Sequence, residues 1–183
     1  DLATNLTPPE ISEALKKKNI KFYETGITHG TITAIINETK FEITSLRKDV
    51  LTDGRHAKVK FSKDWSEDAS RRDFTINAIY ANINGELFDP FCGKKDLEEG
   101  EVKFIGEADK RVKEDYLRIL RYVRFFLNYS KKNHDKKVLS LIRKNLDGIS
   151  KISSERLLDE FKKLVTSNGL SKLYKDPNSL EII

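Results

Sequence analysis

The sequence predicts an α+β fold, with a small mixed β-sheet and flanking helices first and an all-helical region after them. Two observations predict this class. β-Branched runs at residues 31–36 and 40–46 alternate with a period of two, as strands do. Beyond about residue 108, apolar residues instead recur at helical spacing. We therefore place a domain boundary near residue 105, between residues 1–105 and residues 106–183.

Composition narrows the class of protein. The length of 183 residues suits one generous domain or one domain plus part of a second. The composition, 38% hydrophobic and 34% charged, is typical of a globular protein with a charge-rich surface. No apolar run approaches the roughly 20 residues of a membrane span, so no membrane partner is expected. The single cysteine, Cys92, excludes an internal disulfide and suits a reducing compartment, which predicts a cytoplasmic location. The net charge of +5 permits a polyanionic partner without requiring one.

Local signals predict the first elements. The segment TPPE at residues 7–10 combines a threonine cap, a proline at the first helical position and a glutamate three residues after the cap. The helix is expected to extend to about Lys18. The two β-branched runs then form a hairpin, since the polar residues 37–39 between them are typical of a turn.

The second strand of this hairpin carries an acidic residue. Successive side chains of a strand point to opposite faces, so Phe41 and Ile43 share one face. Glu42 is therefore expected to point to the other side of the sheet, away from both.

The middle of the chain shows weaker patterns. Residues 47–69 are polar and are predicted to be irregular, with a turn at the DG pair of residues 53–54. Residues 71–78 (RRDFTINA) are expected to start a helix. The NG pair at residues 84–85, between two short apolar runs, predicts a second hairpin.

Helices are expected in the rest of the chain. Their predicted bounds are residues 108–130, 137–145 and 153–165, and a short helical piece at 170–175 should end at the following Asp-Pro pair.

One stretch of the first of these helices is unusual. In residues 114–126 (EDYLRILRYVRFF), Asp115, Arg118, Arg121 and Arg124 follow one another every three residues. Each step turns the side chain by only about 60° around the helix axis. One carboxylate and three guanidiniums should therefore lie on one flank, above an apolar stripe. A solvated basic face on a core helix is one interpretation of this pattern, and a binding site is the other.

Several segments together resemble a known family. They resemble, in the right order, the tRNA nucleotidyltransferase and poly(A) polymerase family of bacterial type, within the superfamily that includes DNA polymerase β. The matching segments are DLATNLTP at 1–8, HGTITAII at 29–36, FEITSLR at 41–47, DGRHAKVKF at 53–61, RRDFTINAIYA at 71–81, DPFCGKKDL at 89–97, EDYLRILRYVRFF at 114–126 and SSERLLDEF at 153–161. Cys92 stands where the family usually has glycine, and we expect little functional effect from this departure.

The resemblance implies nucleotidyl transfer that depends on two divalent ions, typically Mg²⁺. Asp1 matches the second of two metal-binding aspartates, so the resemblance implies that it is a metal ligand and a catalytic residue. Glu42 matches a third catalytic carboxylate. In the family, a glycine turn, a helix and another aspartate precede Asp1, so we expect the sequence to be truncated within this motif. Family members also continue with further helical domains, so truncation is expected at the C-terminus too.

The resemblance also implies how the nucleobase is selected. Cytosine and adenine each present an exocyclic amine donor beside a ring-nitrogen acceptor. Asp115 can accept from the amine, and Arg118 can donate to the ring nitrogen. Uracil and guanine present other patterns that would leave buried polar groups unpaired, and such mismatches discriminate strongly. Asp115 and Arg118 are thereby implied to act as an amino-acid template for CTP and ATP.

Four more residues match nucleotide-binding positions of the family. Arg121 and Arg124 suit phosphate contacts by their charge. Arg72 matches another nucleotide-binding arginine, and Asp73 matches the position that binds the ribose. The implied head domain is residues 1–105, and the implied helical neck that carries the base-recognition helix is residues 106–183.

The resemblance favours a CCA-adding enzyme that acts on the tRNA 3′ end, and several alternatives stay open. A poly(A) polymerase and a partial CC- or A-adding enzyme share the same segments. A catalytically silent RNA-binding protein could also retain the fold. A basic cluster at Lys131, Lys132, Lys136 and Lys137 is either a solvated face or a contact with tRNA phosphates.

Overall fold

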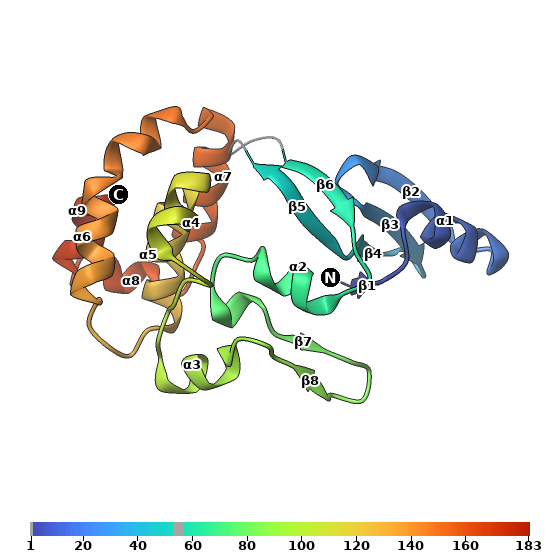
Figure 1. The fold of residues 1–183 in the computed structure, drawn as a ribbon, viewed down its shortest axis with the longest axis horizontal. Helices are drawn as coiled ribbons and strands as arrows, with labels where there is room; N and C mark the ends of the chain where they lie inside the picture. Colours follow the sequence, from blue (N-terminus) through green and yellow to red (C-terminus); the bar gives the residue numbers. More distant parts are fainter. Residues whose placement is uncertain (1, 53–56) are drawn as a thin grey trace. The chain divides into compact units, whose positions relative to one another are not determined.

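The computed structural model describes residues 2–52 and 57–183 (Figure 1). Asp1 and the turn expected at residues 53–54 lie outside the described residues. The described chain separates into two compact units, one of residues 2–52 and 57–71 and one of residues 72–183. The boundary expected near residue 105 thus lies inside the second unit. Phe74 and Phe104, which lie on its N-terminal side, pack with the helices that follow, and the rings of Phe74 and Phe125 are 5.1 Å apart.

The first unit is built on a small mixed sheet, as predicted. In spatial order its strands are β1 (Leu2–Thr4), β4 (Thr39–Ser45), β3 (Thr31–Ile36) and β2 (Lys21–Gly26). β1 runs parallel to β4, and the other neighbouring strands are antiparallel. The hairpin of β3 and β4 confirms the prediction, whereas β2 was not predicted.

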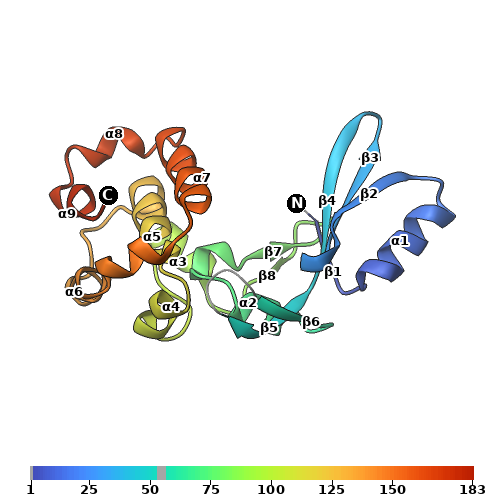
Figure 2. The same cartoon turned by 90° about the horizontal axis from the view of Figure 1, so that it is seen from above.

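Helix α1 (Pro8–Lys17) packs on one face of this sheet (Figure 2). The backbone N–H of Thr7 donates to the Glu10 carboxylate at 2.6 Å, which is the capping contact expected from the sequence. Ile11 on α1 and Ile32 on β3 form the centre of a small apolar core. Because local capping and an apolar face agree, α1 begins and ends where the sequence predicts, within one residue.

The region predicted to be irregular contains regular structure, so that prediction was wrong. β5 (Arg47–Thr52) and β6 (Ala57–Phe61) form an antiparallel pair, and α2 (Trp65–Ser70) follows. Lys48 pairs with Lys60 in the strand register. Charged residues at such positions remove the alternation by which strands are recognised, while backbone hydrogen bonds still form the ladder.

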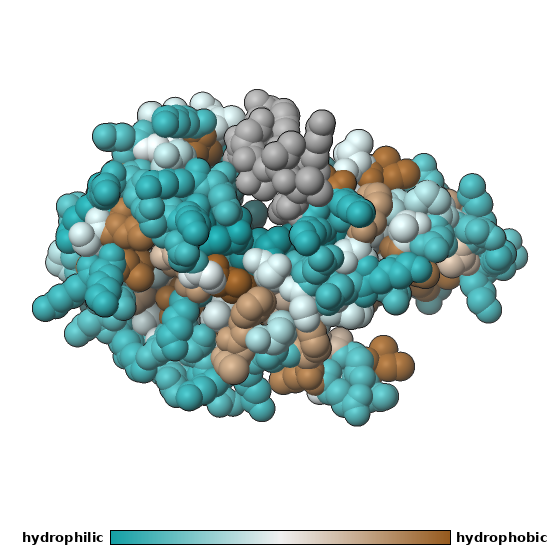
Figure 3. Space-filling model, viewed as in Figure 1, coloured by the Kyte–Doolittle hydropathy of each residue, from teal (hydrophilic) through white to brown (hydrophobic). Residues whose placement is uncertain are grey.

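The second unit begins with a turn, a hairpin and a short helix. The helix expected at residues 71–78 is only the 3₁₀ turn η2 (Thr75–Asn77). The hairpin of β7 (Tyr80–Ala81) and β8 (Leu87–Phe88) forms around the NG pair as predicted. Hydrophobic side chains of this hairpin are exposed, and they form a brown area on the face drawn in Figure 3. Helix α3 (Gly93–Glu99) follows.

The remaining helices pack around α5 (Leu117–Tyr129), as Figures 1 and 2 show. These elements are α4 (Ala108–Glu114), α6 (Lys136–Lys144), η3 (Leu146–Lys151), α7 (Ser154–Val165), α8 (Leu170–Leu173) and α9 (Pro177–Ile182). Ile119 and Val123 of α5 are completely buried in this core. No helix of the described chain combines the length and apolar character that a membrane crossing requires.

One prediction for the helical region was wrong, and another was incomplete. The single helix expected at residues 108–130 is divided into α4 and α5, because Asp115 between them is extended, with φ −155° and ψ 104°. The short piece expected at residues 170–175 does end before the Asp-Pro pair, as α8 (Leu170–Leu173), but it is not the last helix. Pro177 opens α9, since proline is well tolerated in the first turn of a helix.

Candidate functional site

Glu42 lies on the face of the sheet opposite α1. Its cross-strand partner is Thr33 of β3, and the next residue, Ile43, pairs with Leu2 of β1 and packs against the core below α1. The alternation of side chains therefore turns Glu42 to the other face, as predicted. On that face the hydroxyl oxygens of Thr31 and Thr44 lie 3.0 Å apart and share a hydrogen bond.

The donor chemistry of Glu42 fits a hard divalent ion. Its side chain is exposed and makes no hydrogen bond or ion pair with the described chain, so both oxygens are available. Asp1, which is the metal ligand expected from the sequence, lies outside the described residues. Within residues 2–52 and 57–183, no three acidic, histidine or cysteine side chains are grouped to hold a metal ion.

Asp73 is a buried carboxylate in the second unit. One of its oxygens accepts from the backbone N–H of Phe74 and from the Asn77 amide, both at 3.0 Å. The other accepts from Nε of Arg121 at 2.5 Å. Burial alone would raise the pKa of Asp73, but the charge of Arg121 and the hydrogen bonds from Arg121 and Asn77 hold it below its usual value. Asp73 therefore stays ionised and fixes the guanidinium of Arg121.

Asp115 is held at the junction of α4 and α5. Its Oδ1 accepts from the backbone N–H of Leu117 at 3.2 Å, and its Oδ2 accepts from Nη2 of Arg156 at 2.7 Å. Arg156 comes from α7, 41 residues away in sequence. The orientation of the carboxylate is thus fixed by a backbone N–H at the start of α5 and by the guanidinium of Arg156, which is distant in sequence only.

Arg118 occupies the first turn of α5. Its Nη1 donates to the carboxylate of Glu114 and to the carbonyl of Arg111, both at 2.7 Å. Arg111 also donates to Glu114, at 2.7 Å. The backbone N–H of Arg118 donates to the carbonyl of Asp115 at 3.0 Å. Asp115 and Arg118 are therefore joined by a backbone hydrogen bond in one helical turn, while each side chain has its own ionic partner.

The other two arginines of the flank share one carboxylate. Glu160 of α7 is only 2% exposed and accepts from Nε of Arg124 at 2.6 Å. Nη1 of Arg121 lies 3.8 Å from the same carboxylate. Both guanidiniums also lie over the ring of Phe125, at 5.6 and 4.6 Å from its centroid.

The solvated-face interpretation of this flank is wrong. The side chains of Arg118, Arg121 and Arg124 are 12%, 24% and 16% exposed, respectively. Each has an acidic partner, from Glu114, Asp73 or Glu160. The flank is a partly buried row of ion pairs with fixed geometry. Such a row can present defined donors and acceptors to a polar ligand.

Arg72 stands at the start of the second unit, next to Asp73. Its guanidinium lies 5.7 Å from the ring of Tyr80, and its carbonyl accepts from Nη2 of Arg111 at 2.5 Å. Arg111 therefore links the segment of Arg72 to the acidic group at Glu114.

The sequence did not predict the ionic partners of these residues, which are Arg111, Glu114, Arg156 and Glu160. One signal was present for Glu160. It lies on the helix face of Leu157 and Leu164, so a carboxylate interrupts an apolar stripe at helical spacing. A charged residue at such a position usually has a buried partner.

Comparisons with known proteins show which proteins the chain resembles in sequence. Residues 1–103 match the family model described as the poly A polymerase head domain, and residues 134–176 match that of the probable RNA and SrmB-binding site of polymerase A. The human mitochondrial CCA tRNA nucleotidyltransferase 1 is 46% identical over 176 residues, which cover 94% of this chain and 41% of the human protein. The chain thus spans less than half the length of this curated relative.

Two solved structures are similar as well. The CCA-adding enzyme of Bacillus stearothermophilus in complex with CTP aligns with a TM-score of 0.79 and 29% identity, over 93% of this chain and 40% of that one. A tRNA nucleotidyltransferase complexed with a primer tRNA and an incoming ATP analogue aligns with a TM-score of 0.70 and 25% identity, over 96% and 50% of the two chains. Because the head-domain model alone matches more than half of the residues, the chain belongs to the tRNA nucleotidyltransferase and poly(A) polymerase family.

Proposed function

We propose that the protein containing this chain adds C and A nucleotides to the 3′ end of tRNA, using CTP and ATP. The observation that carries the proposal is the junction of α4 and α5, where Asp115 and Arg118 are adjacent and separately held by ionic partners. Similarity to CCA-adding enzymes along nearly the whole chain supports the same function.

Asp115 and Arg118 form the proposed base-recognition pair. A carboxylate oxygen of Asp115 accepts from the exocyclic amine of cytosine or adenine, and the guanidinium of Arg118 donates to the adjacent ring nitrogen. Arg156 and Glu114 keep the two side chains in place while the base binds. A uracil in this site would face an acceptor with a carbonyl and a donor with an N–H, so it is rejected.

The other residues of the second unit bind the rest of the nucleotide in this proposal. Arg121 and Arg124 contact phosphate oxygens with the donors that Asp73 and Glu160 leave unused. Arg72 adds a further cationic contact. Asp73 accepts from a ribose hydroxyl, and it also keeps the Arg121 guanidinium in place.

Glu42 and Asp1 hold the metal ions in this proposal. Two divalent ions, with Mg²⁺ the natural choice for oxygen ligands, would activate the attacking ribose hydroxyl and neutralise the leaving pyrophosphate when bound. Glu42 supports this role because its carboxylate is exposed and otherwise unengaged among the described residues. Glu42 also directly precedes Ile43 on β4, and Ile43 pairs with Leu2 of β1 in the sheet.

The decisive experiment offers tRNA without its CCA end to the full-length protein, with Mg²⁺ and each nucleoside triphosphate separately and in mixture. Incorporation of C and then A supports the proposal. Long A tracts would instead indicate a poly(A) polymerase, which the name of the matching head-domain family keeps as the second candidate. Addition of C alone or A alone would indicate a partial enzyme, and tRNA binding without incorporation would indicate a silent RNA-binding protein.

The site of action in the cell is part of the proposal. A cytoplasmic location stays a prediction, because the human relative named above is mitochondrial. Imaging of the tagged full-length protein would distinguish the two compartments.

A further inference from the structure

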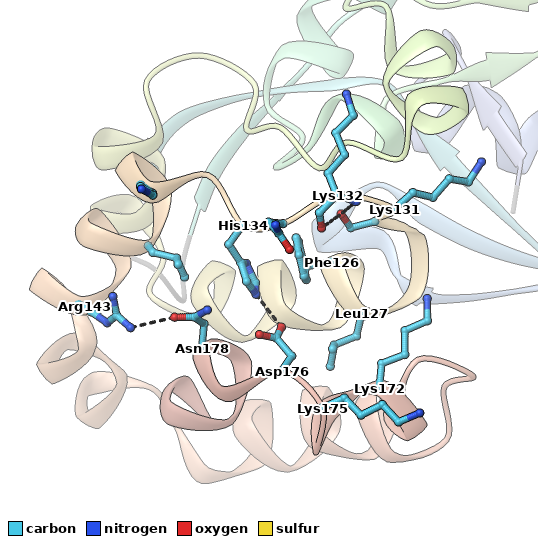
Figure 4. Close-up of a pocket in the computed structure, with 14 residues that line it drawn as sticks. Phe126, Leu127, Lys131, Lys132, His134, Arg143, Lys172, Lys175, Asp176 and Asn178 are labelled. Carbon is cyan, nitrogen blue, oxygen red and sulfur yellow. Dashed lines mark hydrogen bonds and ion pairs between the residues drawn. The ribbon is translucent and has the colours of Figure 1, made fainter.

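A basic cavity of about 840 Å³ lies on the second unit, beside the end of α5 (Figure 4). The loop after α5, together with α6, α8 and α9, completes its walls. Its lining contains six cations and one carboxylate, which is Asp176. The cations are Lys131, Lys132, Lys136, Arg143, Lys172 and Lys175. Segments far apart in sequence therefore bring one sign of charge to one cavity.

The single carboxylate is already engaged. Its Oδ2 lies 2.7 Å from Nε2 of His134 and accepts from the Ser179 hydroxyl at 2.6 Å. The imidazole of His134 stacks on the ring of Phe126, with centroids 3.5 Å apart and planes 14° from parallel. The other ring nitrogen of His134 lies 3.0 Å from the hydroxyl of Tyr122. Asp176 thus belongs to a fixed internal network and forms no ion pair with a lysine of the cavity.

Four of the six cations have no acidic partner in the described chain. Lys131 donates to the backbone carbonyl of Glu98 at 3.3 Å. The other three, Lys136, Lys172 and Lys175, make no side-chain hydrogen bond or ion pair with the described chain, and all three side chains are exposed. In contrast, Lys132 pairs with Glu101, and Arg143 pairs with Glu181 at 2.6 Å. In Figure 4, Lys131 and Lys132 lie on one side of the opening, and Lys172 and Lys175 lie on the other. The cavity therefore has an uncompensated positive rim over an apolar and aromatic floor.

A neighbouring cavity of about 480 Å³ lacks this excess of charge. Its lining combines Lys103 and Lys132 with the acidic residues Glu101 and Asp135. Lys103 and Glu101 are paired with each other. The second cavity therefore does not share the uncompensated positive charge of the first.

We propose that this basic cavity binds backbone phosphates of the tRNA, at a distance along α5 from the base-recognition pair. Lysine ammoniums bind phosphates as point charges, and phosphate contacts position a nucleic acid without reading its sequence. The residues that match the RNA-binding family model, 134–176, include four of the six cations. That the polyanion is tRNA rests on the proposed function. Three phosphate contacts would keep the 3′ end at the catalytic site through successive additions.

The test uses the full-length protein and the triple variant Lys136→Gln/Lys172→Gln/Lys175→Gln. Glutamine retains most of the side-chain length and removes the charge. The dissociation constant for tRNA should rise at least about tenfold at 0.1 M salt. The slope of log affinity against log salt concentration should decrease by about 2, since each phosphate contact contributes about 0.7–0.9. KM for tRNA should rise while kcat stays within about twofold.

The matched control is Lys17→Gln/Lys94→Gln/Lys95→Gln. It removes the same charge from exposed lysines that pair with glutamates within their own helices. Thermal unfolding checks that both proteins are folded. If the cavity variant loses no more tRNA affinity than the control, or keeps the wild-type salt slope, the proposal is overturned. If wild-type protein binds and extends tRNA in that case, only the cavity proposal fails. If wild-type protein binds tRNA but incorporates no nucleotide, the proposed function fails while the cavity proposal is still tested by affinity.

A second arm separates RNA phosphate from the triphosphate of a nucleotide. CTP is titrated onto wild-type protein and onto the cavity variant. An unchanged dissociation constant for CTP supports the proposal. A loss of CTP affinity without a loss of tRNA affinity would make the cavity a nucleotide site and would overturn it.

Discussion

At the scale of single residues, Asp115 owes its position to a break between two helices. The extended backbone at Asp115 ends α4 and lets its side chain accept from the first free N–H group of α5. Arg156 engages the other oxygen, with side-chain exposures of 31% for Arg156 and 21% for Asp115. A carboxylate with these partners is oriented but still reachable by a ligand, which is what selective recognition of a base requires.

Replacement of Asp115 by alanine should therefore weaken base selectivity. We expect the ratio of kcat/KM for CTP over UTP to fall at least about tenfold, because the acceptor that rejects uracil is gone. The same ratio for Asp109→Ala, which removes an exposed carboxylate of α4, should remain that of wild type. Single-nucleotide incorporation with each triphosphate measures both, and an unaltered ratio in Asp115→Ala would refute the template role.

The ionisation of Asp73 should make the free energy of unfolding depend on pH. Its pKa is below the usual value of 3.8, so its contribution to stability is fully present above pH 3.8. That contribution is lost as the pH falls through the depressed pKa, when protonation breaks the ion pair with Arg121. We expect Asp73→Asn to be less stable by about 3 kcal/mol at pH 7. Below pH 3.8 the difference should shrink.

Denaturant unfolding of both proteins between pH 7 and pH 2.5 measures this effect. A constant difference over the whole range would show that Asp73 acts through its shape and hydrogen bonds, and not through its charge.

The backbone conformation at Cys92 is one that favours glycine, the residue that the family usually has at this position. Its backbone is left-handed, with φ 57° and ψ 32°, directly before the first residue of α3. A side chain costs about 1–2 kcal/mol in this region, and glycine avoids that cost. Cys92→Gly should raise the free energy of unfolding by up to about 1 kcal/mol, less than the full cost because glycine is more flexible when unfolded. Cys92→Val should lower it, and urea titration of the three proteins tests the order.

At the scale of elements, α5 and α7 are joined by charge as well as by apolar packing. Leu164 of α7 packs in the core around α5, and Glu160 stands one helical turn before it with Arg124 as its partner. Glu160 is buried, so its charge is tolerated only because the arginines of α5 compensate for it. The row of arginines therefore depends on α7 for its geometry.

Removal of the Glu160 carboxylate should destabilise the second unit strongly. We expect Glu160→Ala to lower the free energy of unfolding by about 3–5 kcal/mol, since Arg124 and Arg121 lose a buried partner. The control Asp159→Ala removes an exposed carboxylate of the same helix and should change it by less than about 0.5 kcal/mol. A loss below 1 kcal/mol in Glu160→Ala, measured by chemical denaturation, would contradict this account.

At the scale of the whole molecule, each unit has its own core and its own share of the proposed machinery. Residues 74–182 build one apolar core, and residues 11–34 provide the buried residues of the other. Glu42 belongs to the first unit, whereas Asp115 and Arg118 belong to the second. Chemistry and base recognition should accordingly respond to separate substitutions.

Glu42→Gln should reduce nucleotide incorporation by about 100-fold or more, because bound metal supplies several kcal/mol of transition-state stabilisation. The dissociation constant of the Glu42→Gln protein for CTP, measured without divalent ions, should stay within about threefold of the wild-type value. Glu38→Gln, at an exposed position of the turn before β4, is the control and should retain full activity. Equal activity of Glu42→Gln and wild type would remove Glu42 from the proposed site.

How far the sequence predicted each feature depended on how local its cause is. Thr7 and Glu10 form the capping contact that their spacing predicts, and the NG pair forms its hairpin, because these interactions lie within a few residues. The face of Glu42 followed from alternation along one strand. The charge-rich strands β5 and β6 could not be recognised this way, since their pairing rests on backbone hydrogen bonds that carry no side-chain signature.

The sequence by itself determined the α+β class, the main helices, the face of Glu42 and the family to which the chain belongs. Only the tertiary structure decided that α4 and α5 are separate and which acid each arginine meets. Asp73 and Arg121 are 48 residues apart, and Arg124 and Glu160 are 36 apart. Partner choice at such separations depends on how the helices pack around α5, and no spacing along the chain encodes it.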